Sequence, residues 1–279
     1  MREINVSLVE QAVAELCISA NKCLPQELES RIAECAACEE CGLPGSIMQT
    51  IEDNIAAAKE LDIPICQDTG MAVIFMDVGQ DVHLTGGDVN EAIENGVRRA
   101  YRDGCFRASV LSPLTRINTK DNTPAIVHTR IVPGERVTLT AAPKGFGSEN
   151  MSKLWMLTPS QGVEGVKNAI VETVRLAGGN PCPPVVVGVG IGGTAERAML
   201  MAKHSLTREC GVPSDDPMLA DMERELLERI NNLGIGPQGL GGRTTALAVH
   251  IEQMPTHIAG LPVAVNMQCH AARHKTAVI

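Results

Sequence analysis

The chain has 279 residues, of which 44% are hydrophobic and only 2% aromatic, and its formal net charge is -9 at pH 7. This length can bury a sizeable core without disulfides, and the scattered basic residues provide no electrostatic footprint for nucleic acid or an anionic membrane. The first 16 residues carry charges at positions 2, 3, 10 and 15 within a helical pattern, and no stretch reaches the roughly 18 uninterrupted apolar residues of a membrane span. We therefore expect a cytoplasmic protein with no nucleic-acid or membrane partner.

The first half of the chain alternates helical and strand patterns. Apolar residues recur at helical spacing from 7 to about 61, with breaks at 24–25 and 42–45, which predicts three helices packed as one layer. A strand is predicted at 71–78 and a helix at 88–102. Alternating segments at 125–132 and 136–141, separated by Pro-Gly-Glu, are typical of an antiparallel hairpin.

The second half continues with a helix at 163–176, an apolar strand from 184 that enters a glycine turn, and a helix at 194–206. Asp216 and Pro217 form an N-cap and first helical position, and Gly234 ends that helix. Strands at 245–251 and 261–267 bracket a loop that contains His257. The pattern predicts an α+β fold in a single domain, 1–279, in which a helical N-terminal layer (1–62) packs on a mixed or antiparallel sheet with further flanking helices (63–279).

Ten cysteines in a reducing compartment are inert core residues, reactive groups or metal ligands. Cys35, Cys38 and Cys41 have a spacing seen in iron–sulfur proteins. However, they lie at the end of a predicted helix, and no fourth cysteine followed by proline is nearby. We interpret them as structural thiols, and keep as an alternative that they hold a cluster.

Three other cysteines lie in loops beside predicted strands. They are Cys66, Cys182 and Cys269. Such positions expose a thiolate at the edge of a rigid sheet, where small residues and backbone donors can surround a cofactor. The spacing alone does not show that the three converge.

Two glycine-rich segments resemble nucleotide-binding loops. Gly188-x-Gly190-x-x-Gly193 fits the dinucleotide fingerprint, but the acidic residue expected after a second parallel strand is absent. No Lys-Ser or Lys-Thr pair follows the segment 234–242, as a phosphate loop requires. Both segments are therefore interpreted as structural turns.

Five separated segments occur in a fixed order. They are Cys-Gln-Asp-Thr-Gly at 66–70, Lys-Gly-Phe-Gly-Ser-Glu-Asn at 144–150, Cys-Pro-Pro at 182–184 with Gly-Val-Gly-Ile-Gly-Gly at 188–193, Gly-Ile-Gly-Pro-Gln-Gly at 234–239, and Cys-His-Ala at 269–271. Together they resemble the α subunit, or N-terminal domain, of class I iron–sulfur fumarases and tartrate dehydratases. The resemblance covers nearly the whole chain.

The resemblance implies a 4Fe-4S cluster held by three thiolates, which this sequence offers as Cys66, Cys182 and Cys269. The fourth iron has no cysteine and can act as a Lewis acid on a substrate hydroxyl. An iron open in this way should also make the activity sensitive to air.

The resemblance also implies roles for side chains around the cluster. Asp68 matches the proton-handling acid, Gln67 a substrate contact, Arg107 a carboxylate-binding arginine and His257 a substrate-side histidine. Gly145 and Gly147 would allow the backbone to approach the substrate, and His270 and Arg273 are supporting or structural candidates. On residue type alone, Asp68 could cap a turn, His257 could be a loop residue and Arg107 could pair with a surface carboxylate.

We therefore expect a reversible hydro-lyase that acts on a four-carbon 2-hydroxy dicarboxylate. Segment 147–153 resembles the fumarase α chain more than the tartrate dehydratase one, which implies fumarate and malate ahead of L-tartrate, and an L-tartrate dehydratase α subunit is the alternative. The resemblance implies that a β subunit completes the active site in a hetero-oligomer, so the chain alone should be nearly inactive. A rival hypothesis from another class is a non-catalytic iron–sulfur scaffold or redox sensor that uses the Cys35, Cys38 and Cys41 triplet.

Overall fold

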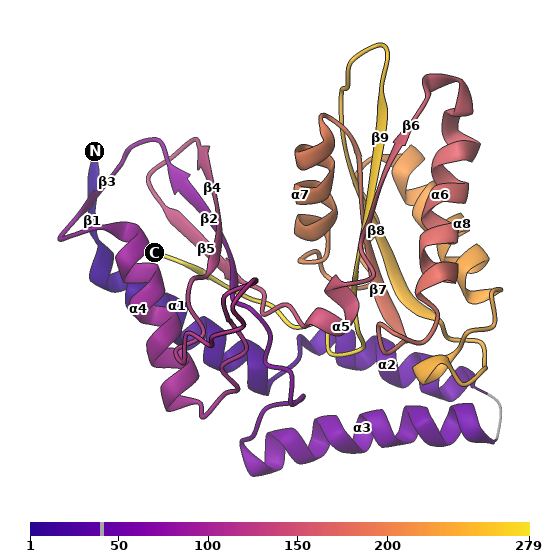
Figure 1. Cartoon of the computed structure of the whole chain (residues 1–279), viewed down its shortest axis with the longest axis horizontal. Coiled ribbons are helices and arrows are strands. Elements are labelled where there is room, and N and C mark those ends of the chain that lie inside the picture. The colour runs from indigo at the N-terminus through magenta and orange to yellow at the C-terminus, as the bar shows by residue number, and fades with distance from the viewer. Residues whose placement is uncertain (40–41) are drawn as a thin grey trace. The chain divides into compact units, whose positions relative to one another are not determined.

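The computed structural model describes residues 1–39 and 42–279. The chain forms two compact units (Figure 1). Unit 1 comprises Met1–Pro25, Ile55–Gly145 and Arg273–Ile279, and unit 2 comprises Gln26–Asn54 and Phe146–Ala272. Each unit contains helices and a mixed four-stranded sheet, which confirms the α+β fold class. None of the helices that the structure describes has the length and apolar character to cross a membrane.

Unit 1 is built around a sheet with the strand order β10-β5-β2-β4. Its elements are β1 (Arg2–Asn5), α1 (Val6–Lys22), β2 (Val73–Gly79), β3 (Val82–Thr85), α4 (Val89–Asp103), β4 (Ile126–Val132), β5 (Val137–Ala141) and β10 (Lys275–Val278). Alternate residues of β2, such as Ile74 and Met76, join a core with Val13 of α1 and Val97 of α4. Burial of this apolar face is the main stabilising term in unit 1.

The predicted hairpin between β4 and β5 is wrong. Both strands instead flank β2, with β4 parallel to it and β5 antiparallel to it. The turn between them passes over the end of β2: the amide of Gln80 donates to Val132 O (2.8 Å), and the amide of Asp81 donates to Gly134 O (2.9 Å). The Pro-Gly-Glu signal correctly marks a turn, but the turn is wide enough to admit a third strand.

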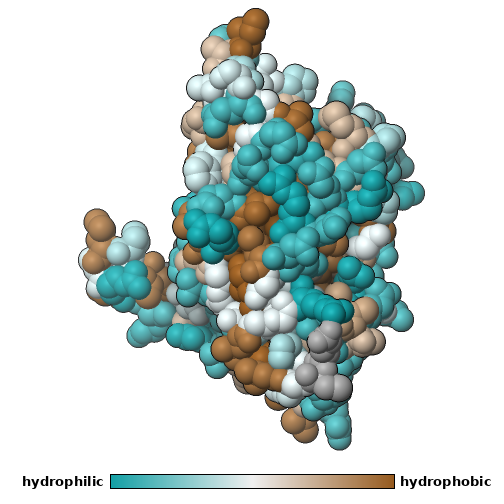
Figure 2. Space-filling model, turned by 90° about the vertical axis from the view of Figure 1, so that its right-hand side faces the viewer, coloured by the Kyte–Doolittle hydropathy of each residue, from teal (hydrophilic) through white to brown (hydrophobic). Residues whose placement is uncertain are grey.

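Unit 2 has the strand order β6-β9-β7-β8. Its helices and strands are α2 (Gln26–Cys38), α5 (Phe146–Glu149), β6 (Lys153–Leu157), α6 (Gly162–Ala177), β7 (Val185–Gly192), α7 (Ala195–Ser205), α8 (Pro217–Asn231), β8 (Ala246–Met254) and β9 (Leu261–Gln268), with 3₁₀ turns η1 (Pro159–Gln161) and η2 (Pro237–Gly239). In Figure 1, α7 covers one face of the sheet and α6 and α8 cover the other. Ion pairs such as Lys167 Nζ to Glu225 Oε2 (2.5 Å) link α6 with α8. Figure 2 shows that the surface on this side of the molecule is largely hydrophilic, with a narrow hydrophobic strip.

The glycines of β7 have a packing role. A Cβ at Gly190 would lie 2.8 Å from the amide nitrogen of Ala202 and closer still to the carbonyl oxygen of Ala198. A Cβ at Gly188 would lie 2.7 Å from Ser205 Oγ. The two glycines therefore allow α7 to lie directly against the sheet, which accounts for the dinucleotide-like pattern without a nucleotide.

The N-terminal helices are divided between the units. Helix α1 belongs to unit 1 and α2 to unit 2, while α3 (Leu43–Leu61) contributes residues to both. Arg31 of α2 donates from Nε to the carbonyl oxygen of Leu247 on β8 (3.1 Å). The expected layer of residues 1–62 is thus shared between the units, and the description of 1–279 as one domain stays a prediction.

Candidate active site

The loop that carries Cys66, Gln67 and Asp68 enters β2 of unit 1 through a tight turn. The amide of Gly70 donates to Asp68 Oδ1 (3.0 Å), and Gly70 has φ 72°. A Cβ at Gly70 would lie 2.6 Å from the backbone carbonyl of Lys144, with which Met71 forms a β-bridge. Only glycine fits this left-handed and crowded position. The turn therefore fixes the backbone from which the Asp68 side chain extends.

A buried hydrogen-bond network connects this loop to the segment that carries Arg107. Thr69 Oγ1 donates to Arg107 O (3.1 Å), and Asn122 Nδ2 donates to Gly70 O (3.1 Å). The hydroxyl of Tyr101 lies 2.7 Å from Thr69 O and 3.0 Å from Gly70 O. Burial raises the pKa of this hydroxyl, which therefore stays a donor. Unit 1 thus brings Asp68 and Arg107 onto segments held by one network.

Two neighbours complete the surroundings of Asp68. Gly145 faces its carboxylate, because a Cβ there would lie 3.1 Å from Asp68 Oδ2. Arg273, which is 4% exposed, donates from Nη2 to the backbone oxygen of Asp68. Gln67 and Arg107 are exposed, whereas Asp68 is half-buried. The two joined segments of unit 1 thus carry a guanidinium, a side-chain amide and a half-buried carboxylate.

Unit 2 brings the other two predicted thiol positions to one end of its sheet. Strands β7 and β9 are antiparallel with Val186 opposite Gln268, so Cys182, before β7, and Cys269, after β9, lie at the same edge. The ring nitrogen Nδ1 of His270 lies 3.1 Å from Cys182 O. Both thiols are at least partly exposed.

The loop that contains η2 supports this edge. Gln238 donates its backbone N–H (2.8 Å) and its Nε2 (2.9 Å) to Pro183 O, and Nε2 lies 3.2 Å from Nδ1 of His270. The segment 234–239 therefore supports the backbone next to Cys182 and the ring of His270, and we do not interpret it as a phosphate loop. Gly147 has ordinary space around it, since a Cβ there would lie 3.6 Å from Asn180 O.

His257 lies at the opposite end of the unit 2 sheet. It is in the exposed loop between β8 and β9, whereas Cys269 follows the far end of β9. Eight strand residues span about 25 Å. Unit 2 does not bring His257 together with Cys182 and Cys269, and its role at the substrate stays a prediction.

Three of the other described cysteines, Cys17, Cys35 and Cys210, are buried, unlike the three loop thiols. Burial raises the pKa of Cys17 to about 12, and burial is also the main cause that raises the pKa of Cys210 to about 12 and that of Cys35. Cys38 is exposed, and Cys41 lies outside the described residues. A buried, protonated thiol is a poor metal ligand, which favours the structural interpretation for Cys35.

Within residues 1–39 and 42–279, no group of three or more His, Cys, Asp or Glu side chains is arranged to hold a metal ion. The predicted set of three thiols draws Cys66 from unit 1 and Cys182 and Cys269 from unit 2. The cluster site is therefore still a prediction from the sequence.

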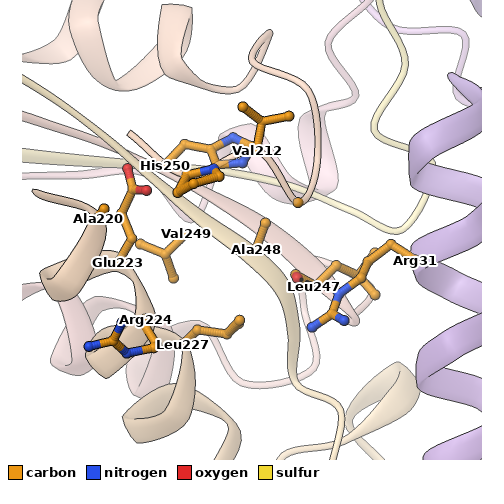
Figure 3. A pocket seen from close by; sticks show the side chains of 12 residues that line it. Arg31, Val212, Ala220, Glu223, Arg224, Leu227, Leu247, Ala248, Val249 and His250 are labelled. Carbon is orange, nitrogen blue, oxygen red and sulfur yellow. Dashed lines mark hydrogen bonds between the residues drawn. The ribbon is translucent and has the colours of Figure 1, made fainter. Parts of the chain in front are cut away.

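A cavity of about 270 Å³ lies along β8 in unit 2, and Figure 3 shows Arg31, Glu223 and His250 around it. Glu223 is buried and accepts hydrogen bonds from Arg208 Nη2 (2.5 Å) and from the amide of Ile251 (2.8 Å). A buried carboxylate needs such partners to offset its desolvation, so we interpret Glu223 as a structural residue. None of the predicted site residues lines this cavity.

Two buried residues of the network escaped the sequence analysis. Asn122 and Tyr101 carry no motif, and each contacts residues more than 30 positions away in the chain. The one available signal was that Tyr101 is the sole tyrosine in a sequence with few aromatics. Their importance follows from the fold alone.

Comparison with known proteins agrees with the resemblance. The model of the fumarate hydratase (Fumerase) family matches residues 10–278. A Methanocaldococcus jannaschii protein with the provisional name of L(+)-tartrate dehydratase subunit alpha is 41% identical over 271 residues, or 95% of each chain. The L(+)-tartrate dehydratase subunits alpha of Escherichia coli strain K12 and Shigella sonnei are each 30% identical over 278 residues, covering 98% of this chain and 91% of theirs. The chain therefore belongs to the fumarate hydratase (Fumerase) family.

Proposed function

We propose that this chain is the α subunit of an iron–sulfur hydro-lyase that removes water from a four-carbon 2-hydroxy dicarboxylate. The observation that carries the proposal is the network in unit 1, which holds Asp68 and Arg107 on adjoining segments. We put L(+)-tartrate first among the candidate substrates, because these relatives are named as L(+)-tartrate dehydratase subunits alpha. This reverses the order expected from segment 147–153.

The exposed side chains of unit 1 suit this substrate class. A guanidinium binds a carboxylate through two parallel hydrogen bonds, so Arg107 would anchor one end of the dicarboxylate. Gln67 can hydrogen-bond a substrate hydroxyl, and Asp68 would handle the proton at the carbon next to a carboxylate. Loss of water from tartrate leaves an enol that becomes a keto acid, whereas loss of water from malate leaves fumarate.

The donor set fits the 4Fe-4S cluster that the resemblance implies. Cys66, Cys182 and Cys269 lie in loops and are exposed or half-buried, and the latter two lie at one sheet edge. Thiolates are the ligands that iron–sulfur clusters use. When bound, the cluster would supply a Lewis-acidic iron that assists departure of the hydroxyl.

We also propose that a β subunit completes the active site in a hetero-oligomer. The relatives are named as α subunits, which implies such a partner. The chain alone should therefore show little turnover, and co-expression with the partner should restore it. A purified single chain with its cluster intact and full activity would refute this part of the proposal.

The experiment that tests the substrate is a paired assay of the anaerobically purified complex. Formation of a keto acid from L(+)-tartrate at higher kcat/KM than formation of fumarate from L-malate would support the proposal. The reverse order would favour the second candidate, fumarate hydratase, which the description of the matching family supports. Turnover of neither substrate would reject the hydro-lyase.

A further inference from the structure

Asn122 is a fully buried polar residue in the loop between α4 and β4 of unit 1. It is 0% exposed and has φ 61°, a left-handed conformation that asparagine tolerates better than most residues. Its Oδ1 accepts hydrogen bonds from the amides of Ser109 (2.7 Å) and Val110 (3.2 Å), while its Nδ2 donates to Gly70 O (3.1 Å). Both ends of the side-chain amide thus bind backbone.

The backbone groups that Asn122 joins belong to the two segments that carry the candidate site. Gly70 closes the turn on Asp68, and Ser109 lies two residues after Arg107. The Asp68 side of this bridge has further supports, because Lys144 pairs with Met71 and the Tyr101 hydroxyl contacts Gly70 O. On the Arg107 side, Asn122 is the acceptor for two successive amides, those of Ser109 and Val110.

Other contacts also hold the Arg107 segment: the amide of Phe106, in the buried core, donates to Tyr101 O (2.9 Å), and the amide of Thr119 donates to Val110 O (3.0 Å). Thr69 Oγ1 donates to Arg107 O (3.1 Å), and Asn118 Nδ2 donates to Ala108 O (2.9 Å). Loss of Asn122 would leave two amides without their acceptor, and the amide of Val110 belongs to a residue only 6% exposed. An unsatisfied buried amide is costly, so the segment would shift toward other acceptors.

We propose that Asn122 is a positioning residue that holds the Arg107 segment in place relative to Asp68, so that Arg107 can bind one carboxylate of the dicarboxylate through two hydrogen bonds. This inference rests on the proposed function and adds a residue that determines substrate placement. Asn122 does not touch the substrate. Its side chain is neutral and adds no charge between the arginine and the carboxylate, which a buried aspartate in its place would do.

The geometry explains why binding should respond more than turnover. Two-point recognition of a carboxylate by a guanidinium tolerates little displacement. A shift of Arg107 weakens substrate and transition state alike, which raises KM and leaves kcat nearly unchanged. A merely structural Asn122 would instead lower the folded fraction and leave the KM of the remaining enzyme as it was.

The test uses the full chain in complex with its partner, with iron content measured for each variant. Asn122→Gly removes all three hydrogen bonds without straining the left-handed backbone. Asn122→Asp keeps the acceptor for the two amides, replaces the donor to Gly70 O by an oxygen and adds a negative charge, and it is the second variant if the glycine variant fails to fold. The matched control is Asn231→Asp in unit 2, because Asn231 Oδ1 also accepts two amides and its Nδ2 also donates to a carbonyl oxygen.

The expected result for Asn122→Gly is a KM at least about tenfold higher for whichever of L(+)-tartrate or L-malate the wild type dehydrates, a shift of ~1.4 kcal/mol, with kcat within about threefold. Hydrogen exchange at Ser109 and Val110 should become faster. Asn122→Asp should raise KM severalfold, and Asn231→Asp should leave it within about twofold.

An unchanged KM in both Asn122 variants, whatever the exchange rates, would overturn the positioning role and leave the proposed function standing. A wild-type complex that contains the cluster but turns over neither substrate would overturn the proposed function, and this inference with it.

Discussion

Replacement of Gly190 by alanine tests the account of the glycine motif in β7. The new methyl group would meet Ala202 N at 2.8 Å and Ala198 O more closely, below the 3.0 Å that real Cβ atoms respect, and both atoms belong to the backbone of α7. The helix would have to move away from the sheet. Such overpacking costs about 1–3 kcal/mol, which exceeds the gain of up to ~1 kcal/mol from a less flexible unfolded chain.

The assay is thermal unfolding followed by the fluorescence of Trp155, the sole tryptophan, which lies on β6 of unit 2. For a unit of this size we expect the Tm to fall by roughly 3–10 °C. Gly260→Ala is the control, because no atom lies within 3.8 Å of its Cβ position. A Gly190→Ala chain as stable as the control would refute the packing explanation and reopen the nucleotide hypothesis.

Two further predictions concern unit 1. Burial and the nearby charge of Lys275 lower the pKa of His274 to about 4, so the folded state favours the neutral imidazole. The free energy of unfolding should therefore be highest above the unfolded pKa of about 6.5 and should fall as pH drops from there to about 4, because the unfolded chain binds the proton first. His274→Gln should make the Tm depend less on pH over this range. Tyr101→Phe removes the donor to Thr69 O and Gly70 O and should cost about 1–3 kcal/mol in urea unfolding; no change would show that the network does not stabilise the loop.

Local signals predicted the helices well. Asp88 accepts hydrogen bonds from the first amides of α4, and Asp216 caps α8 with Pro217 in the first turn. These contacts join residues two or three positions apart, so composition and spacing encode them directly. The strands that the sequence analysis identified also exist, because alternation of apolar residues reflects burial of one sheet face.

Long-range arrangement could not be predicted in the same way. The sequence of the turn between β4 and β5 gave no indication that β2 lies between these two strands. Strands β1, β3, β6 and β10 were too short to be recognised from the sequence. For the candidate site, the Asp68 turn followed from its sequence. The link to Arg107 depends on the hydrogen bond between Asn122 and Gly70, which are 52 positions apart, and it needed the fold. The position of His257 depends on the length of β9, which motif order does not reveal.

The measurement that tests the central claim most directly is iron and acid-labile sulfide per chain after strictly anaerobic purification of the complex. It compares wild type with Cys66→Ser, Cys182→Ser, Cys269→Ser and, as control, the exposed Cys38→Ser. We expect about four iron and four sulfide in wild type and in the control, and loss of both in the other three variants. A metal-free wild type, or loss confined to Cys38→Ser, would contradict the three-thiolate site and the hydro-lyase built on it.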